Sequence, residues 1–156
     1  IKSIGSRKFS QKGVIKWDNV RKNALQLIAK YKIKVPNPNV FVSNLSGGNQ
    51  QKVVLARELN AKPSILVCAQ ATRGLDLGAV DSLHELLLEE RNRGCAVIFI
   101  STELSEVMSL SDRIIVMYKG KIMGEVDGEN ANIETIGEMM LGKKIENNST
   151  LRGIYE

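Results

Sequence analysis

Two short apolar runs with a helical segment between them constrain the fold of this chain most strongly. Residues 65 to 69 and residues 96 to 100 are continuous apolar runs of strand length. Apolar residues between positions 80 and 87 recur at helical spacing, and Gly94 follows that pattern as a C-terminal cap. Two buried strands joined by a helix form a βαβ unit with parallel strands and a right-handed crossover. The sequence therefore predicts an α/β fold with a mostly parallel sheet and flanking helices.

The N-terminal third is expected to hold one amphipathic helix. Apolar residues recur at helical spacing from Trp17 to Tyr31, Asp18 serves as the N-cap, and Pro36 stops the pattern. Trp17 and Tyr31 are expected to pack in the core. Residues 1 to 14 show no period and are expected to form an extended or frayed lead-in.

The C-terminal third predicts a second group of elements. Lys119 and Gly120 have the composition of a two-residue hairpin turn. The polar tail from Gly142 to Glu156 is expected to be loose. The elements expected around that turn are a helix at 103 to 110, strands at 113 to 118 and 121 to 126, and a helix at 133 to 141.

The composition is that of an ordinary globular domain. A chain of 156 residues, 43% hydrophobic and 25% charged, can bury a core of its own. Its apolar runs are far shorter than the ~20 residues of a membrane helix, so no segment is expected to span a bilayer. Because the first residue is Ile1, the sequence is expected to be a piece of a longer protein.

The net charge of +5 is concentrated near the N-terminus, and only 4% of residues are aromatic. A basic, solvated surface, including one near anionic lipid headgroups, is therefore favoured over a nucleic-acid-binding face, which would need stacking aromatics. Cys68 and Cys95 have no metal-ligand spacing and are interpreted as small core residues, with no disulfide. His84, the only histidine, receives no role.

A glycine-rich helix start is the strongest functional feature. Ser46 suits an N-cap, where its oxygen can accept a hydrogen bond from a backbone N–H group. Gly47 and Gly48 carry no Cβ atom to keep an anion away from the first turn, where the helix dipole is positive. The alternative interpretation is an ordinary capped helix with no ligand. Two glycines would destabilise such a helix with no compensating gain. An anion site is therefore favoured.

The stretch from Leu45 to Lys52, Leu-Ser-Gly-Gly-Asn-Gln-Gln-Lys, resembles the signature motif of ABC-transporter ATPases. Asn49 in the fifth place is typical of bacterial importers of sugars and nucleosides whose ATPase subunit carries two fused cassettes. The resemblance implies a partial P-loop NTPase (ABC ATPase) cassette. Its expected parts are a helical-subdomain part with the signature motif at 1–62, a RecA-like part at 63–126, and a C-terminal helix and tail at 127–156.

Departures from the family pattern are informative. The strand ending at Ala69 resembles the Walker B strand, but Ala69 and Gln70 replace its Asp and Glu, and Thr102 replaces the switch histidine. Losing a general base costs about 10²- to 10⁴-fold in rate. No Gly-x-x-x-x-Gly-Lys-Ser/Thr occurs, so the Walker A portion is missing and the chain is expected to be the C-terminal part of the second cassette. Alone, it is expected to be inactive, with no metal site and no bound cofactor.

The family likeness also implies roles in a larger assembly. Ser46, Gly47, Gly48, Asn49 and Gln50 would contact, in trans, ATP held by the other cassette. Asp76, at the D-loop position, would lie across the seam between cassettes. ATP and Mg²⁺ are the cofactors expected in the full-length assembly.

The implied location is the cytoplasmic face of the bacterial membrane. The implied partners are the other cassette, transmembrane permease subunits and, indirectly, an extracytoplasmic substrate-binding protein, with no nucleic acid. The alternatives are a non-hydrolysing docking or regulatory module for a permease, and a nucleic-acid-linked ABC ATPase.

Overall fold

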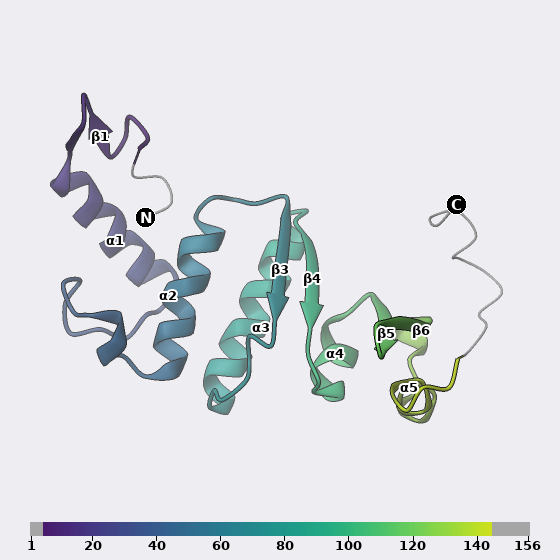
Figure 1. Ribbon diagram of the computed structural model, residues 1–156. Coiled ribbons are helices and arrows are strands. Elements are labelled where there is room, and N and C mark those ends of the chain that lie inside the picture. Colours follow the sequence, from purple (N-terminus) through teal and green to yellow (C-terminus); the bar gives the residue numbers. More distant parts are fainter. Residues whose placement is uncertain (1–4, 145–156) are drawn as a thin grey trace. The chain divides into compact units, whose positions relative to one another are not determined.

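The computed structural model of the chain describes residues 5 to 144 (Figure 1). The part of the predicted tail from residue 145 on lies outside the described residues. The chain forms two compact units, one up to Ile98 and one from Phe99, which are described separately. The three functional parts expected from the sequence stay a prediction.

The first unit begins with a hairpin where an irregular lead-in was predicted. Strands β1 (Ser10–Gln11) and β2 (Val14–Ile15) pair antiparallel. The two residues between them, Lys12 and Gly13, have φ of 49° and 80°. Positive φ at both central positions is what a tight hairpin turn requires. For residues 5 to 14 the prediction of an extended or frayed lead-in is therefore wrong, because the Lys-Gly turn joins two strands that are too short to show an alternating pattern, and residues 1 to 4 lie outside the described residues.

Helix α1 spans Trp17–Lys30, close to the prediction. Its N-cap is Lys16, with no side-chain cap, so Asp18 lies in the first turn and the prediction of an Asp18 cap is wrong. Tyr31 is buried as predicted, at 2% exposure, whereas Trp17 is 68% exposed. The core prediction for Trp17 fails because Trp17 is the first residue of the helix and precedes Asn23, the buried residue of α1, by more than one turn.

The signature helix follows a Pro- and Asn-rich connector. A short 3₁₀ turn, η1 (Val42–Asn44), leads into α2 (Gly47–Leu59). The buried residues of α2 are Leu55, Ala56 and Leu59. The predicted position of this helix is confirmed.

The predicted strand–helix–strand unit is present. Strand β3 (Ile65–Ala69) leads through a loop to α3 (Leu77–Asn92) and then to β4 (Ala96–Ile100). The two strands are neighbours in one sheet and point the same way (Figure 1). Buried and exposed residues alternate along β3, so one face of this strand is covered, and the buried residues of this region are Leu66, Cys68, Leu83, Leu87 and Cys95. Both cysteines are free thiols, as predicted.

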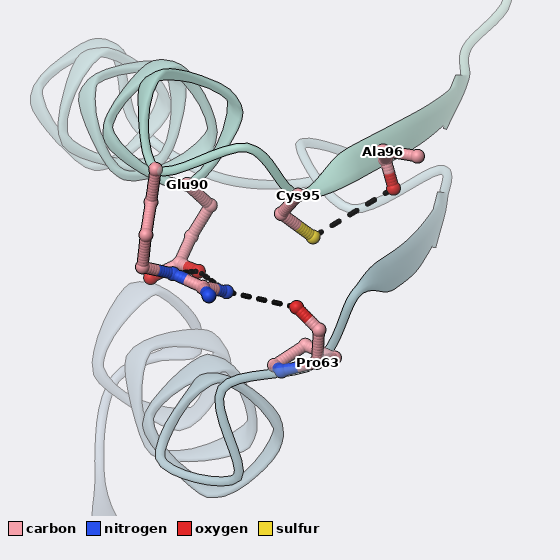
Figure 2. Close-up of polar contacts among 5 residues, drawn as sticks. Pro63, Glu90, Cys95 and Ala96 are labelled. Atoms are coloured by element: carbon pink, nitrogen blue, oxygen red, sulfur yellow. Dashed lines mark hydrogen bonds and ion pairs between the residues drawn. The ribbon is translucent and has the colours of Figure 1, made fainter.

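A partly buried ion pair holds the C-terminal end of α3. The Arg93 guanidinium donates from Nε to Glu90 over 2.8 Å and from Nη2 to the Pro63 carbonyl over 2.8 Å (Figure 2). Glu90 is only 8% exposed, so Arg93 neutralises a carboxylate that has little access to water. Gly94, with φ of 91°, then turns the chain toward β4.

The second unit is built around a hairpin that the sequence predicts. Strands β5 (Arg113–Tyr118) and β6 (Lys121–Asp127) pair antiparallel, and the turn residues Lys119 and Gly120 have φ of 47° and 76°. The remaining elements are α4 (Leu104–Leu110), η2 (Gly128–Asn130) and α5 (Ile133–Met140). The core of this unit consists of Ile114, Val116, Met123, Ile136 and Met139.

Within residues 5 to 144, no helix is both long enough and apolar enough to cross a bilayer.

Candidate functional site

The N-terminus of α2 is open to solvent. Ser46 occupies the predicted N-cap position, and both Ser46 and Gly47 are exposed. The predicted hydrogen bond from a backbone N–H group to the Ser46 hydroxyl is absent. Instead, Ser46 Oγ accepts a hydrogen bond from Asn49 Nδ2 over 2.9 Å, because the amide one turn along the helix reaches the same oxygen. The Ser46 hydroxyl hydrogen and the N–H groups of the first turn thus remain available to an anion.

Asn49 is held from both ends. Its Oδ1 accepts a hydrogen bond from the backbone N–H of Lys34 over 2.8 Å, while its Nδ2 donates to Ser46. The Lys34 donor fixes which end of the amide is oxygen, so the NH₂ end must face Ser46. Asn49 therefore orients Ser46 and connects the signature turn to the segment after α1. Sequence reasoning placed Asn49 in the site but missed Lys34, fifteen residues away.

Gln50 stabilises the turn through hydrogen bonds to the residues just before α2. Its side-chain Nε2 donates to the carbonyl of Leu45 over 2.8 Å, and its backbone N–H donates to Ser46 O over 2.9 Å. Both contacts tie the start of α2 to the chain just before it. The Gln50 amide thus stabilises the turn, because its NH₂ group donates to the backbone of the same chain.

The two signature glycines differ in what surrounds them. A Cβ atom added at Gly47 would meet nothing within 4 Å, whereas one added at Gly48 would lie 2.9 Å from the Ala79 Cβ. Gly48 is therefore required by the close approach of α2 to the first turn of α3. Gly47 has no such packing reason, and its open surroundings suit the approach of a ligand.

The loop after β3 lies against the same end of α2. Gln51 Nε2 donates to the Ala71 carbonyl over 3.1 Å, and Gln70 has a φ of 51°. Asp76 caps α3, because its Oδ1 accepts the Ala79 N–H over 2.9 Å. The N-terminal ends of α2 and α3 are thus adjacent, as Figure 1 also shows. Two positive helix ends side by side raise the local potential for an anion.

The positions that would hold metal and activate water carry no ionisable group. Ala69 ends β3 with an exposed methyl group, and Gln70 follows it with a neutral amide. Thr102 belongs to the second unit, where it is exposed. Across residues 5 to 144, no three His, Cys, Asp or Glu side chains group together as a metal site would require.

The buried thiol of Cys68, in β3, is not a nucleophile. Burial raises the pKa of Cys68 above the usual 9.0, and the nearby Cys95 raises it further. The thiolate is the reactive form, so Cys68 stays protonated and inert at neutral pH.

A separate apolar cavity of about 360 Å³ lies between α1, the connector and α2. Leu27, Ile28 and Val53 contribute to its walls, together with Asn23, which is 5% exposed. Of the signature stretch, only its first residue, Leu45, lines this cavity, and Val53 lines it just after the stretch ends. The cavity and the open helix end are therefore distinct features.

Comparison with solved structures defines the fold class. The ADP- and Pi-bound dimeric post-hydrolysis state of the ATP-binding cassette MJ0796 matches 76% of this chain and 51% of its own, with a TM-score of 0.64 and 27% identity. An inward-facing putative metal-chelate type ABC transporter matches 90% of this chain and 55% of its own, with a TM-score of 0.72 at 16% identity. The described residues therefore have the fold of part of an ABC ATPase cassette.

Sequence comparison finds relatives of one kind within the ABC ATPase class. No protein-family model matches the chain. It is 39% identical to the guanosine import ATP-binding protein NupO of Bacillus subtilis (strain 168), over 91% of this chain and 28% of that protein. It is 48% identical to the ribose import ATP-binding protein RbsA of Clostridium perfringens (strain SM101 / Type A), over 74% of this chain and 23% of that protein. The chain spans about a quarter of the length of these curated relatives, which are ATP-binding proteins of ABC importers for sugars and nucleosides.

Proposed function

We propose that this chain is the C-terminal part of the second ATP-binding cassette in a bacterial ABC importer subunit for nucleosides or simple sugars. The relatives support this proposal by their function, since guanosine and ribose import ATP-binding proteins match most of the chain. The absence of a Walker A motif from these 156 residues supports the assignment to the later part of a cassette.

In this proposal, the open end of α2 binds the γ-phosphate of ATP carried by the partner cassette. The single observation that carries it is the exposed Ser46–Gly47 turn, with nothing within 4 Å of a Cβ added at Gly47. Ser46 Oγ accepts from Asn49, so the hydroxyl hydrogen can be donated to a phosphate oxygen. Bound Mg²⁺–ATP supplies the triphosphate to be cleaved, while Ser46 and the backbone of the turn hold its terminal phosphate in place.

Asp76 has a supporting part in the proposal. Its side chain caps α3, which fixes the loop beside the signature turn. The Asp76 residue is exposed, so its carboxylate can also face a partner across the seam between cassettes. We assign it a positioning role.

The proposed assembly has two unequal ATP sites. The site closed by Ser46 and Gly47 hydrolyses ATP when the partner cassette supplies the metal-binding Asp and the general base. The other site holds nucleotide with little turnover, because the Walker B and switch positions of this sequence carry a methyl, an amide and a hydroxyl group (Ala69, Gln70 and Thr102), none of which acts as a base near pH 7. Mg²⁺ at that second site gains no ligand from Ala69.

The proposed location is the cytoplasmic face of the bacterial membrane. There the subunit would contact the permease, and through it an extracytoplasmic substrate-binding protein. The import function of the relatives supports these partners.

The experiment that tests this function uses the full-length subunit and measures ATP hydrolysis. Replacing the catalytic Glu of the partner cassette should abolish rapid hydrolysis, and Ser46→Arg should do the same by filling the anion site. Ser43→Arg, an exposed serine in the turn just before, is the matched control and should keep the normal rate. Rapid hydrolysis without the partner's Glu, or a normal rate in Ser46→Arg, would refute the proposal.

The apolar cavity favours a second candidate function, that of a non-hydrolysing docking module for a permease. It offers about 360 Å³ of mainly aliphatic lining in the helical part of the chain. Contact between ATP and Ser46 distinguishes the two functions, because only the ATPase function requires it. Permease binding that survives in a subunit with no nucleotide contact at Ser46 would favour docking.

A further inference from the structure

Charge is divided sharply along the sequence. Residues 1 to 62 hold thirteen basic and two acidic residues, an excess of eleven positive charges. Residues 63 to 156 hold nine basic and fifteen acidic residues, an excess of six negative charges. The anion site at Ser46 does not account for this, because most of the basic residues lie well before the signature turn. A second anionic partner for the N-terminal part is therefore indicated.

The positive charge gathers at the N-terminal hairpin. A cleft of about 650 Å³ is lined by Arg7, Lys12 and Lys16 with the polar residues Ser10 and Gln11. Lys16 Nζ donates to the Arg7 carbonyl over 3.3 Å, which holds the start of α1 against the segment before β1. No acidic residue lines this cleft. Its chemistry matches phosphate groups, which pair well with Lys and Arg.

The same hairpin exposes large apolar side chains. Val14 is 70% exposed and Trp17, the only tryptophan, is 68% exposed, whereas the neighbouring Phe9 is 3% exposed. Val14 follows the hairpin turn directly, and Trp17 follows Lys16. Basic residues interleaved with an exposed tryptophan and an aliphatic residue are typical of segments that lie at the interface between lipid and water.

We propose that this basic hairpin surface, defined by Arg7, Lys12, Val14, Lys16 and Trp17, docks on the anionic headgroups of a phospholipid bilayer. The three cations pair with headgroup phosphates, while Val14 and Trp17 enter the interfacial zone. A nucleic acid fits less well, because the segment exposes one aromatic ring and stacking surfaces use several. The inference goes beyond the proposed ATPase role and does not depend on it, since no signature residue takes part.

The test uses the chain with vesicles and reads the fluorescence of Trp17, which is the chain's only tryptophan. Vesicles made of equal parts phosphatidylcholine and phosphatidylglycerol should co-sediment with the chain and shift the Trp17 emission to the blue. Vesicles of phosphatidylcholine alone should do neither. Replacing the three cations together, R7Q/K12Q/K16Q, should weaken partitioning about 100-fold, and V14S should weaken it by a smaller factor.

A matched control variant distinguishes an effect of the hairpin's own charges on partitioning from an effect of the chain's net charge. K119Q/K121Q/K144Q removes three exposed positive charges from the second unit and should leave partitioning near the wild-type value. The proposal is overturned by equal binding to neutral vesicles, by an unshifted Trp17 emission on bound vesicles, or by equal losses in the two triple variants. It is also overturned if the chain binds a single-stranded oligonucleotide through Arg7, Lys12 and Lys16 and ignores the anionic vesicles. Because the Trp17 shift is measured on the unaltered chain, the proposal stays testable even if a variant misfolds.

Discussion

The side-chain amide of Asn49 donates a hydrogen bond to the Ser46 hydroxyl oxygen over 2.9 Å, within the first turn of α2. The serine at the cap therefore does not close its own helix end. The other end of the Asn49 amide accepts from the Lys34 N–H group, so the orientation of Ser46 is set by a segment fifteen residues earlier. In the proposed function, this open helix end with its oriented hydroxyl group serves as the anion site.

Asn49→Ala removes both of these hydrogen bonds. We expect the free energy of unfolding to fall by about 0.5 to 1.5 kcal/mol, because two hydrogen bonds are lost and the exposed Lys34 N–H group can bond to water instead. Turnover of the assembled subunit should fall about 10- to 100-fold as Ser46 loses its orientation. Urea unfolding and an ATPase assay measure the two effects, with Asn39→Ala, an exposed asparagine of the connector, as the control. Equal behaviour of the two variants would show that Asn49 does not position Ser46.

The two signature glycines should respond differently to alanine. Gly47→Ala should keep or slightly raise stability, by up to about 1 kcal/mol, because Gly47 has open surroundings and alanine favours helix. Gly48→Ala should destabilise the chain by about 1 to 3 kcal/mol, because its methyl group would meet Ala79. Thermal unfolding distinguishes the variants. The double variant G48A/A79G should recover part of the loss, and no recovery would mean that this contact is not the cause.

Arg93→Ala should be among the most destabilising surface changes. It leaves the Glu90 carboxylate, at 8% exposure, without its cation, and it removes the bond to the Pro63 carbonyl. A loss of about 1 to 3 kcal/mol is expected, because the Glu90 carboxylate has little access to water while Arg93 itself is partly exposed. Arg57→Ala breaks the more exposed pair with Glu58 and should cost less than about 1 kcal/mol. Similar losses in the two variants, measured in urea, would contradict this account of α3.

The Cys68 thiol should make stability depend on pH in the alkaline range. Burial raises the pKa of Cys68 above 9.0 in the folded chain, so the folded state retains a proton that the unfolded chain releases. The stabilisation is complete below pH 9.0 and is lost as pH rises above that value. The difference in unfolding free energy between the wild type and Cys68→Ala should therefore change between pH 8 and pH 10, with the wild type losing more. A difference that is constant with pH would refute a raised pKa.

Much of the fold follows from local sequence pattern. The apolar runs predict β3 and β4 at the bounds that the structure gives, and the helical spacing between positions 80 and 87 lies within α3. Lys119 and Gly120 predict a hairpin because long strands flank them. Lys12 and Gly13 make a turn of the same kind, which goes unnoticed because β1 and β2 have two residues each. Both hairpins have a Lys-Gly turn. Only the turn at Lys119 and Gly120 is flanked by strands long enough to show an apolar pattern.

The site was less predictable, because its details depend on contacts between distant segments. The sequence treats Gly47 and Gly48 alike, and only the approach of Ala79 to Gly48 separates them. Trp17 has the spacing of a core residue, yet the helix begins with it and leaves it exposed. The bond between Asn49 and Lys34 joins two parts of the chain that no periodic pattern relates.

The central claim is that Ser46 contacts the terminal phosphate of ATP held by another cassette. The most direct measurement is photocrosslinking in the full-length subunit with an ATP analogue that carries its reactive group on the γ-phosphate, followed by mapping of the labelled peptide. We predict labelling at Ser46 or Gly47 that disappears when the Walker A lysine of the partner cassette is replaced. Labelling that persists without the partner's Walker A lysine, or that avoids the signature turn altogether, would contradict the account.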